Sequence, residues 1–162
     1  MDPSAPIEPT YSAPQGDFTI YCRERVLVLV PRTDGGFDVL RPFIQARAVE
    51  VGGPVSLLVL VRPGVRAAAA HLRDEVSALL LDLGTDITLV AVAIDGRGFF
   101  ASTFMSIASG LFMFTRHGDT PLRAFRGVEP AWTWIQEESG DPAPWLPGYV
   151  ADIRAALDSA ST

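Results

Sequence analysis

Two almost entirely apolar runs of strand length constrain the fold of this chain more than any other feature. They are VSLLVLV, from Val55 to Val61, and ITLVAVAI, from Ile87 to Ile94. A strand that is apolar at nearly every position is typical of a sheet that is covered on both faces. Segments with helical periodicity alternate with these runs, which indicates right-handed crossovers. We therefore predict an α/β fold, a single domain in which helices pack on a mixed sheet of four or five strands.

Weaker patterns supply the remaining elements. FTIYC and VLVLV, separated by three charged residues, predict a hairpin of two strands over 18–22 and 26–30. Helical spacing predicts helices over 38–51, 65–83, 128–138 and 149–159, and a short strand falls within 120–126. Pro42 allows the first regular helix to begin as late as Arg41.

The chain divides into four parts by composition. We expect residues 1–16 to form a disordered Pro-rich tail, residues 17–138 to form the α/β domain, residues 139–148 to form a Pro/Gly-rich linker, and residues 149–162 to form a C-terminal helix. A chain of 162 residues is long enough for one domain with a substantial core.

Charge and cysteine content exclude several classes of protein. A net charge of -6 argues against a nucleic-acid-binding face, because such faces need clustered cations. Cys22 is alone, which excludes an internal disulfide framework and a cluster of thiolates around a metal. The first residues do not resemble a signal peptide, so we expect a cytoplasmic protein.

The stretch GFFASTFMSIASGLFMF, residues 98–114, contains no charged residue. It is shorter than the roughly twenty apolar residues of a membrane span, and it carries hydroxyl side chains, so we predict no span. As a helix it places one bulky stripe on the sheet and leaves Met105 and Phe112 on another sector. Either the C-terminal helix covers that sector, or it contacts another protein. On the second reading Met105, Ser109 and Phe112 bind the partner.

Three tryptophans are further candidates for the core or for an interface. We expect either Trp132 or Trp134 to face the core, because they lie two residues apart on one predicted helix. Trp145 lies in a Pro-rich segment, where it either anchors the C-terminal region to the domain or binds a partner. We include it among the partner-binding candidates.

The carboxyl edge of the two apolar strands is a candidate ligand site, because open α/β folds bind ligands there. Arg62 and Arg66 flank the turn after the first apolar strand, and Gly96, Arg97 and Gly98 follow the second. These five residues would bind a small anionic or apolar ligand. Solvated surface arginines and a simple turn are the alternatives, since Ala101 stands where the dinucleotide fingerprint needs a third glycine.

No residue pattern indicates catalysis. His71 and His117 lack a second histidine at ligand spacing, and the serines lack the Gly-x-Ser-x-Gly elbow of hydrolases. In an apolar strand, Cys22 is typical of an inert core thiol. We predict no catalytic residue, no metal, no cofactor and no enzyme activity.

The order of elements, together with VAVAIDGRGFFASTFMSIASGLFMFTRHGDTPLRAFRGVEPAWTWI, resembles the STAS domain of bacterial anti-sigma factor antagonists. The resemblance covers about residues 17–138 and rests on an apolar strand, a helix, a short basic strand and a closing helix with tryptophan. Phosphoregulated members of that family carry a hydroxyl residue at the start of the helix after the central strand. The matching segment here, Val59 to Arg73, has no Ser or Thr.

A STAS-like chain without that acceptor implies a scaffold, a constitutive partner binder or a small-ligand sensor. Our leading functional expectation is a non-catalytic regulatory or scaffold protein that binds a protein partner or a second copy of itself. The alternative is a sensor of a small anionic or apolar ligand at the edge with Arg62, Arg66 and Arg97.

Overall fold

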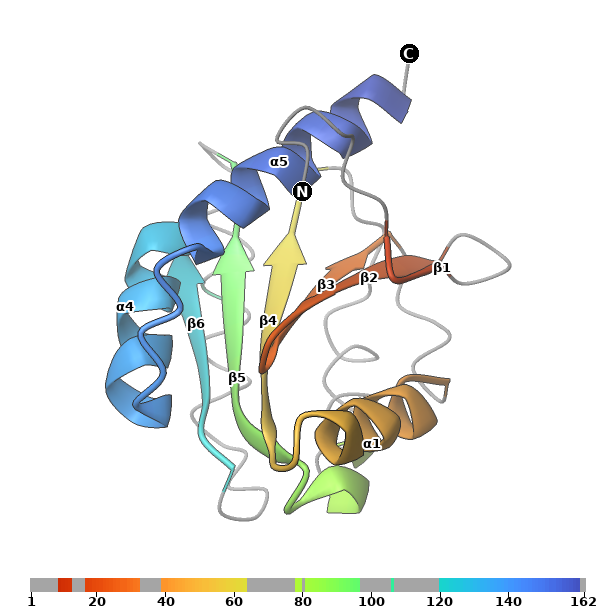
Figure 1. Ribbon diagram of the computed structural model, residues 1–162. Helices are drawn as coiled ribbons and strands as arrows, with labels where there is room; N and C mark the ends of the chain where they lie inside the picture. The colour runs from red at the N-terminus through yellow and green to blue at the C-terminus, as the bar shows by residue number, and fades with distance from the viewer. Residues whose placement is uncertain are drawn as a thin grey trace.

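The structure is a computed structural model that describes residues 9–12, 17–32, 39–63, 78–79, 81–96, 106 and 120–160 (Figure 1). Its α/β architecture agrees with the prediction from the sequence. The elements and their bounds are β1 (Tyr11–Ser12), β2 (Phe18–Arg23), β3 (Val26–Pro31), α1 (Leu40–Glu50), β4 (Val55–Val61), β5 (Ile87–Ile94), β6 (Leu122–Arg126), α4 (Val128–Ser139) and α5 (Leu146–Ala160).

The strands form one mixed sheet in which spatial order follows chain order, from β1 at one edge to β6 at the other. The pairs β1–β2 and β2–β3 are antiparallel, whereas β3–β4, β4–β5 and β5–β6 are parallel. This confirms the predicted mixed sheet and the hairpin. The predicted number of four or five strands was wrong, because the sheet has six.

The additional strand is β1, which lies inside the segment predicted as a tail. The Tyr11 ring packs 5.9 Å from the rings of both Phe18 and Phe43, measured between centroids. The Thr10 hydroxyl accepts a hydrogen bond of 3.0 Å from the backbone N–H of Cys22. These contacts hold a two-residue strand against β2, although its own sequence has no strand pattern.

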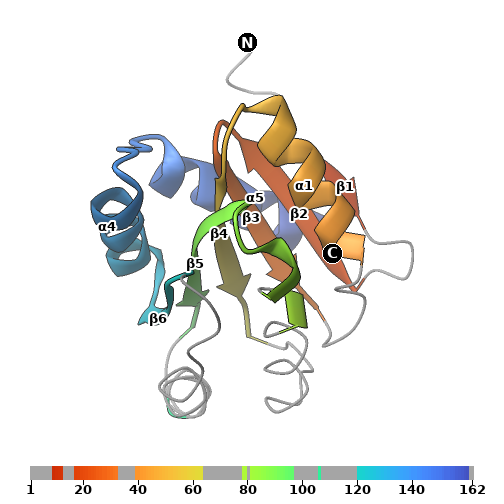
Figure 2. The same ribbon diagram turned by 90° about the horizontal axis from the view of Figure 1, so that it is seen from below.

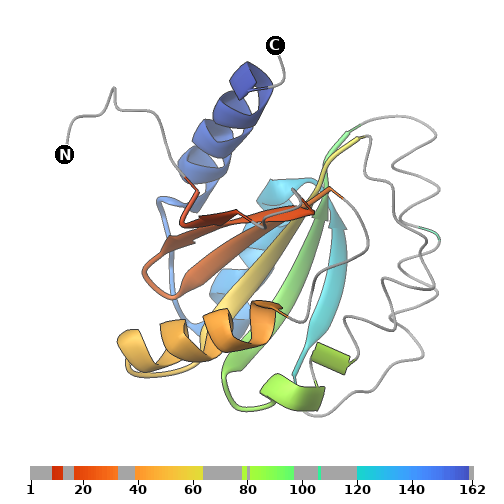
Figure 3. The same ribbon diagram turned by 90° about the vertical axis from the view of Figure 1, so that its right-hand side faces the viewer.

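Helices cover both faces of the sheet. One apolar cluster includes Leu40 and Ile44 of α1, together with Leu79 and Leu83, and lies on one face. Figure 2 shows α1 and the segment with Leu83 on the same side. The other cluster joins α4 and α5 to the opposite face (Figure 3). Strand β4 is buried at every position, as its apolar sequence predicts for a central strand.

The C-terminal part of the chain belongs to this core. Helix α5 begins at Leu146, three residues before the expected start, and its buried residues are Leu146, Val150, Ile153 and Leu157. In α4, Trp134 is buried, whereas Trp132 is only partly buried. This confirms that one of these two tryptophans faces the core. None of the described helices is long and apolar enough to cross a membrane.

Ile153→Ala should lower the free energy of unfolding by about 2–5 kcal/mol, because it removes methyl groups from a fully buried position. Urea unfolding followed by circular dichroism measures this loss. Asp152→Ala is the matched control, since Asp152 is the exposed neighbour on α5, and it should change stability by less than about 0.5 kcal/mol. Equal losses in the two variants would contradict the docking of α5 on the sheet.

Candidate functional site

The structure describes some of the residues that the sequence singled out. Arg62 lies directly after β4, Gly96 lies two residues after β5, and Trp145 lies just before α5. The other candidates lie outside the described residues: Arg66, Arg97, Gly98, Met105, Ser109 and Phe112.

Four charged residues lie in adjacent positions across one end of the sheet. We call Asp17, Arg32, Arg62 and Asp95 the charge row. Asp17 precedes β2, and its carbonyl oxygen accepts a hydrogen bond of 2.7 Å from the Arg32 backbone N–H. The backbone N–H of Asp95 donates to the Val61 carbonyl at 2.7 Å. The row therefore runs from the start of β2 across the carboxyl ends of β3, β4 and β5.

Alternation along the strands places this row on the face that α5 covers. In β4, Leu58 and Leu60 belong to the cluster under α4 and α5, and Ala91 and Ala93 belong to it in β5. Since side chains alternate between faces, Arg62 and Asp95 continue that face at the carboxyl end. Figure 1 shows α5 passing the ends of β4 and β5.

Helix α5 is joined to the row by two ion pairs. Arg154 donates two hydrogen bonds to the Asp95 carboxylate, at 2.7 and 2.9 Å. Arg62 pairs with Asp158 through its Nη2 atom. Residues four apart on a helix are separated by about 6 Å along its axis, and neighbouring strands by about 4.8 Å. This similar spacing lets one side of α5 contact two adjacent strand ends.

Gly96 has a local structural role in the same edge. Its φ angle is 118°, in a region that disfavours residues with a side chain. A glycine at this position therefore lets the chain turn directly after Asp95. This backbone role accounts for Gly96 without a ligand. Of the three arginines predicted at the same edge, Arg66 and Arg97 lie outside the described residues.

A second group of side chains gathers where the β2–β3 hairpin meets the start of α5. We call Arg23, Glu24, Trp145 and Tyr149 the hairpin cluster. The Arg23 guanidinium lies 4.9 Å from the Trp145 ring centroid and 5.8 Å from that of Tyr149. The two rings meet edge to face at 5.5 Å, and the Trp145 indole N–H donates to Glu24 Oε2 at 3.0 Å. Trp145 thus anchors the start of α5 to the hairpin.

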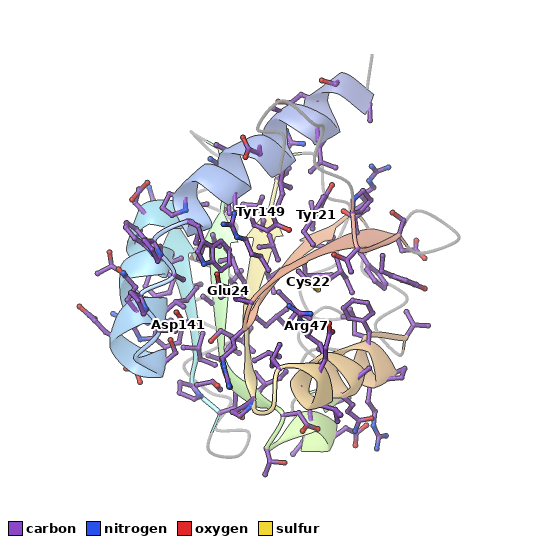
Figure 4. The ribbon with its side chains drawn as sticks, in the orientation of Figure 1. Tyr21, Cys22, Glu24, Arg47, Asp141 and Tyr149 are labelled. Atoms are coloured by element: carbon purple, nitrogen blue, oxygen red, sulfur yellow. The ribbon has the colours of Figure 1, made fainter. Side chains whose placement is uncertain are left out.

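The turn of the hairpin is held from the other side by α1. Glu24 adopts a φ of 51°, which is uncommon for a residue with a side chain. Its carbonyl oxygen accepts a hydrogen bond of 2.7 Å from Arg47 of α1, and Arg25 donates to the Val51 carbonyl at 3.0 Å. Figure 4 shows Glu24 and Arg47 in this region. These hydrogen bonds offset the unfavourable backbone conformation of Glu24 and fix the orientation of the hairpin cluster.

Burial raises the pKa of Tyr149 in this cluster and of two groups next to it, Cys22 and Tyr21. Desolvation raises the pKa of the Cys22 thiol, and so favours its neutral form. Desolvation likewise raises the pKa of Tyr21 and of Tyr149, whose hydroxyl donates to the Cys22 carbonyl at 3.3 Å. A raised pKa lowers the fraction of thiolate, which is the nucleophilic form of cysteine. Among the described residues, no group of three His, Cys, Asp or Glu side chains could hold a metal ion.

Comparisons with known protein families, with curated proteins and with solved structures found no match.

Sequence reasoning missed the partners that α5 supplies. Arg154 and Asp158 lie next to the apolar stripe of the last helix, and their i, i+4 spacing was an available signal. The sequence could not show which strand ends they contact, because Asp158 lies 96 positions after Arg62. Arg23 and Glu24 were predicted only as turn residues, since their aromatic neighbours lie more than a hundred positions later.

Arg154→Met should lower the free energy of unfolding by about 1–3 kcal/mol, because it removes two charge-assisted hydrogen bonds to a partly buried carboxylate. Asp95→Asn and the double variant complete a double-mutant cycle in urea. We expect a coupling energy of about 1 kcal/mol or more. Additive losses in the double variant would show that this ion pair does not hold α5.

Stability should fall as pH rises above about 10, because the ordinary tyrosine pKa is 10.0 and burial raises that of Tyr21 and Tyr149. The unfolded chain loses these protons first and then binds fewer than the folded chain, so unfolding becomes more favourable. Urea unfolding of Tyr149→Phe at about pH 8 and pH 11 should show a smaller alkaline loss than the parent protein. An unchanged loss would mean that Tyr149 is ionised equally in both states.

Proposed function

We propose that this protein is a non-catalytic regulatory or scaffold protein that acts by binding a protein partner, including a second copy of itself. The proposal places it in the cytoplasm and includes the STAS-like assignment, which the order of the described elements supports. The alternative is a sensor of a small ligand at the edge with Arg62, Arg66 and Arg97.

The observation that carries the partner-binding proposal is the composition and rigidity of the hairpin cluster. Arg, Trp and Tyr are the residues most enriched in interface hot spots. Here Arg23 is exposed, and it lies over two rings that are each partly exposed. The hydrogen bond from Trp145 to Glu24 fixes one ring before any partner binds, which reduces the entropy that binding would cost.

A second support comes from the sequence. Met105, Ser109 and Phe112 belong to an uncharged stretch in which one sector either packs under the C-terminal helix or binds a partner, and they lie outside the described residues. The proposal therefore includes two surfaces that separate substitutions can test, one at Arg23 and one at Met105.

Sedimentation velocity tests self-association over a wide range of protein concentration. We expect the mass to rise above the 17.4 kDa of one chain, and Arg23→Glu or Met105→Glu to weaken the association about tenfold or more. Glu137→Gln is the control, because Glu137 is an exposed position on α4 away from the cluster. A protein that remains monomeric throughout would exclude self-association.

Binding of a different protein is tested by a photo-crosslinking amino acid placed at position 23 in living cells. A discrete adduct from position 23 that is missing from position 137 would support the hairpin cluster as the interface. The same adducts from both positions, or none from position 23, would contradict it.

A further inference from the structure

Two N–H groups, on Nε and Nη2, form the side-on edge of the Arg62 guanidinium, and one of them has a hydrogen-bond partner among the described residues. Its Nη2 atom pairs with one oxygen of Asp158. Its Nε atom is buried and has no hydrogen-bond partner in the part of the chain that the structure describes. The Nε and Nη2 groups point in the same direction and together match two oxygens of a carboxylate or a phosphate. Buried donors of this kind are nearly always satisfied, so the free N–H requires an acceptor.

The surroundings of Arg62 favour an anion. Arg32 follows β3 in the charge row, at the end of the adjacent strand and on the same face. Burial raises the pKa of the Tyr21 phenol, and the positive charges of both arginines act in the opposite direction. The hydroxyl of Thr19, also buried on that face, lies beside the Tyr21 phenol.

Asp158 binds only weakly to the Nε/Nη2 edge of Arg62. Its side chain is 67% exposed, although that of Arg62 is 27% exposed, and solvent screens the carboxylate of such a pair. It also lies in the last turn of α5, where the helix dipole disfavours a carboxylate. The pair between Arg154 and Asp95 lies one turn earlier and holds α5 independently. Asp158 can therefore leave Arg62 without detaching the helix.

We propose that Arg62 binds a small oxyanion, a phosphate or a carboxylate group, through Nε and Nη2, and that Asp158 competes with this ligand for the same edge. The ligand satisfies both donors of the fork, whereas Asp158 satisfies one. Binding releases Asp158 and loosens the last turn of α5. This inference deepens the small-ligand alternative and does not depend on partner binding through the hairpin cluster.

Nitrogen-15 NMR of the arginine Nε–H signals tests the proposal directly. Inorganic phosphate and sodium acetate are titrated separately into the full chain, with sodium chloride at the same ionic strength as reference. The Arg62 signal, assigned by its loss in Arg62→Lys, should shift and saturate with at least one of the two oxyanions. Which of them binds distinguishes a phosphate ligand from a carboxylate ligand.

Two variants of α5 separate competition from a general charge effect. Asp158→Asn should bind the oxyanion about fivefold more tightly, because it removes an exposed competing ion pair. Asp152→Asn makes the same change of charge at an exposed position of the same helix and should leave the affinity unchanged. Arg62→Lys keeps the positive charge but loses the paired N–H donors, and it should weaken oxyanion binding about tenfold. Calorimetry measures this loss in the Asp158→Asn background, where the starting affinity is higher.

An Arg62 signal that does not move with either oxyanion would overturn the proposal. Equal affinities in Asp158→Asn and Asp152→Asn would overturn the competition. Circular dichroism confirms that each variant is folded. The titration is repeated in Arg23→Glu, where the affinity should be unchanged, so that failure at Arg62 is separable from failure of the hairpin cluster.

Discussion

The rest of this structure depends on the burial of β4 from both sides. Every residue of this strand is buried, and its side chains alternate between two separate apolar clusters. A sheet with such a strand at its centre exposes a large apolar area unless a layer covers each face. Helix α1 and the segment with Leu79 and Leu83 contribute to one layer, and α4 and α5 form the other. The C-terminal helix is therefore part of the domain and cannot be treated as an appendage.

The position of α5 then determines the two candidate surfaces. At its start, Trp145 and Tyr149 lie against the hairpin, and the Arg23 guanidinium packs over both rings. Toward its end, Arg154 and Asp158 reach the carboxyl ends of β5 and β4. The apolar stripe holds the helix on the sheet, and the polar contacts at its two ends fix its direction. Ligand binding at Arg62 and partner binding at the hairpin would thus act on opposite ends of one helix.

The sequence predicts the central strands well because their composition leaves no alternative. Residues 55–61 and 87–94 are apolar apart from Ser56 and Thr88, and they form β4 and β5 with the predicted bounds. The sequence predicts the sheet edge poorly because tertiary contacts decide it. Tyr11 pairs with β2 where its ring packs on Phe18 and Phe43 and where the neighbouring Thr10 accepts a hydrogen bond from Cys22. A two-residue strand has no periodicity that could reveal this.

The candidate site was predictable only in part, for the same reason. Arg62 and Gly96 could be placed at the carboxyl edge, since parallel strands end together. The pairing of Arg62 with Asp158 depends on how α5 crosses the sheet, and no local pattern encodes that crossing. The indole of Trp145 likewise finds Glu24, which lies 121 positions earlier in the chain.

Native-state hydrogen exchange tests most directly whether α5 is part of the domain. The amides of Val150, Ile153 and Leu157 should exchange with the same free energy of opening as that of Leu58 in β4, because one cooperative unit contains both elements. The last turn, from Asp158 to Ala160, should exchange faster. Exchange of the whole of α5 at a much lower free energy than β4 would contradict the account, because the sheet would then be stable without its second layer.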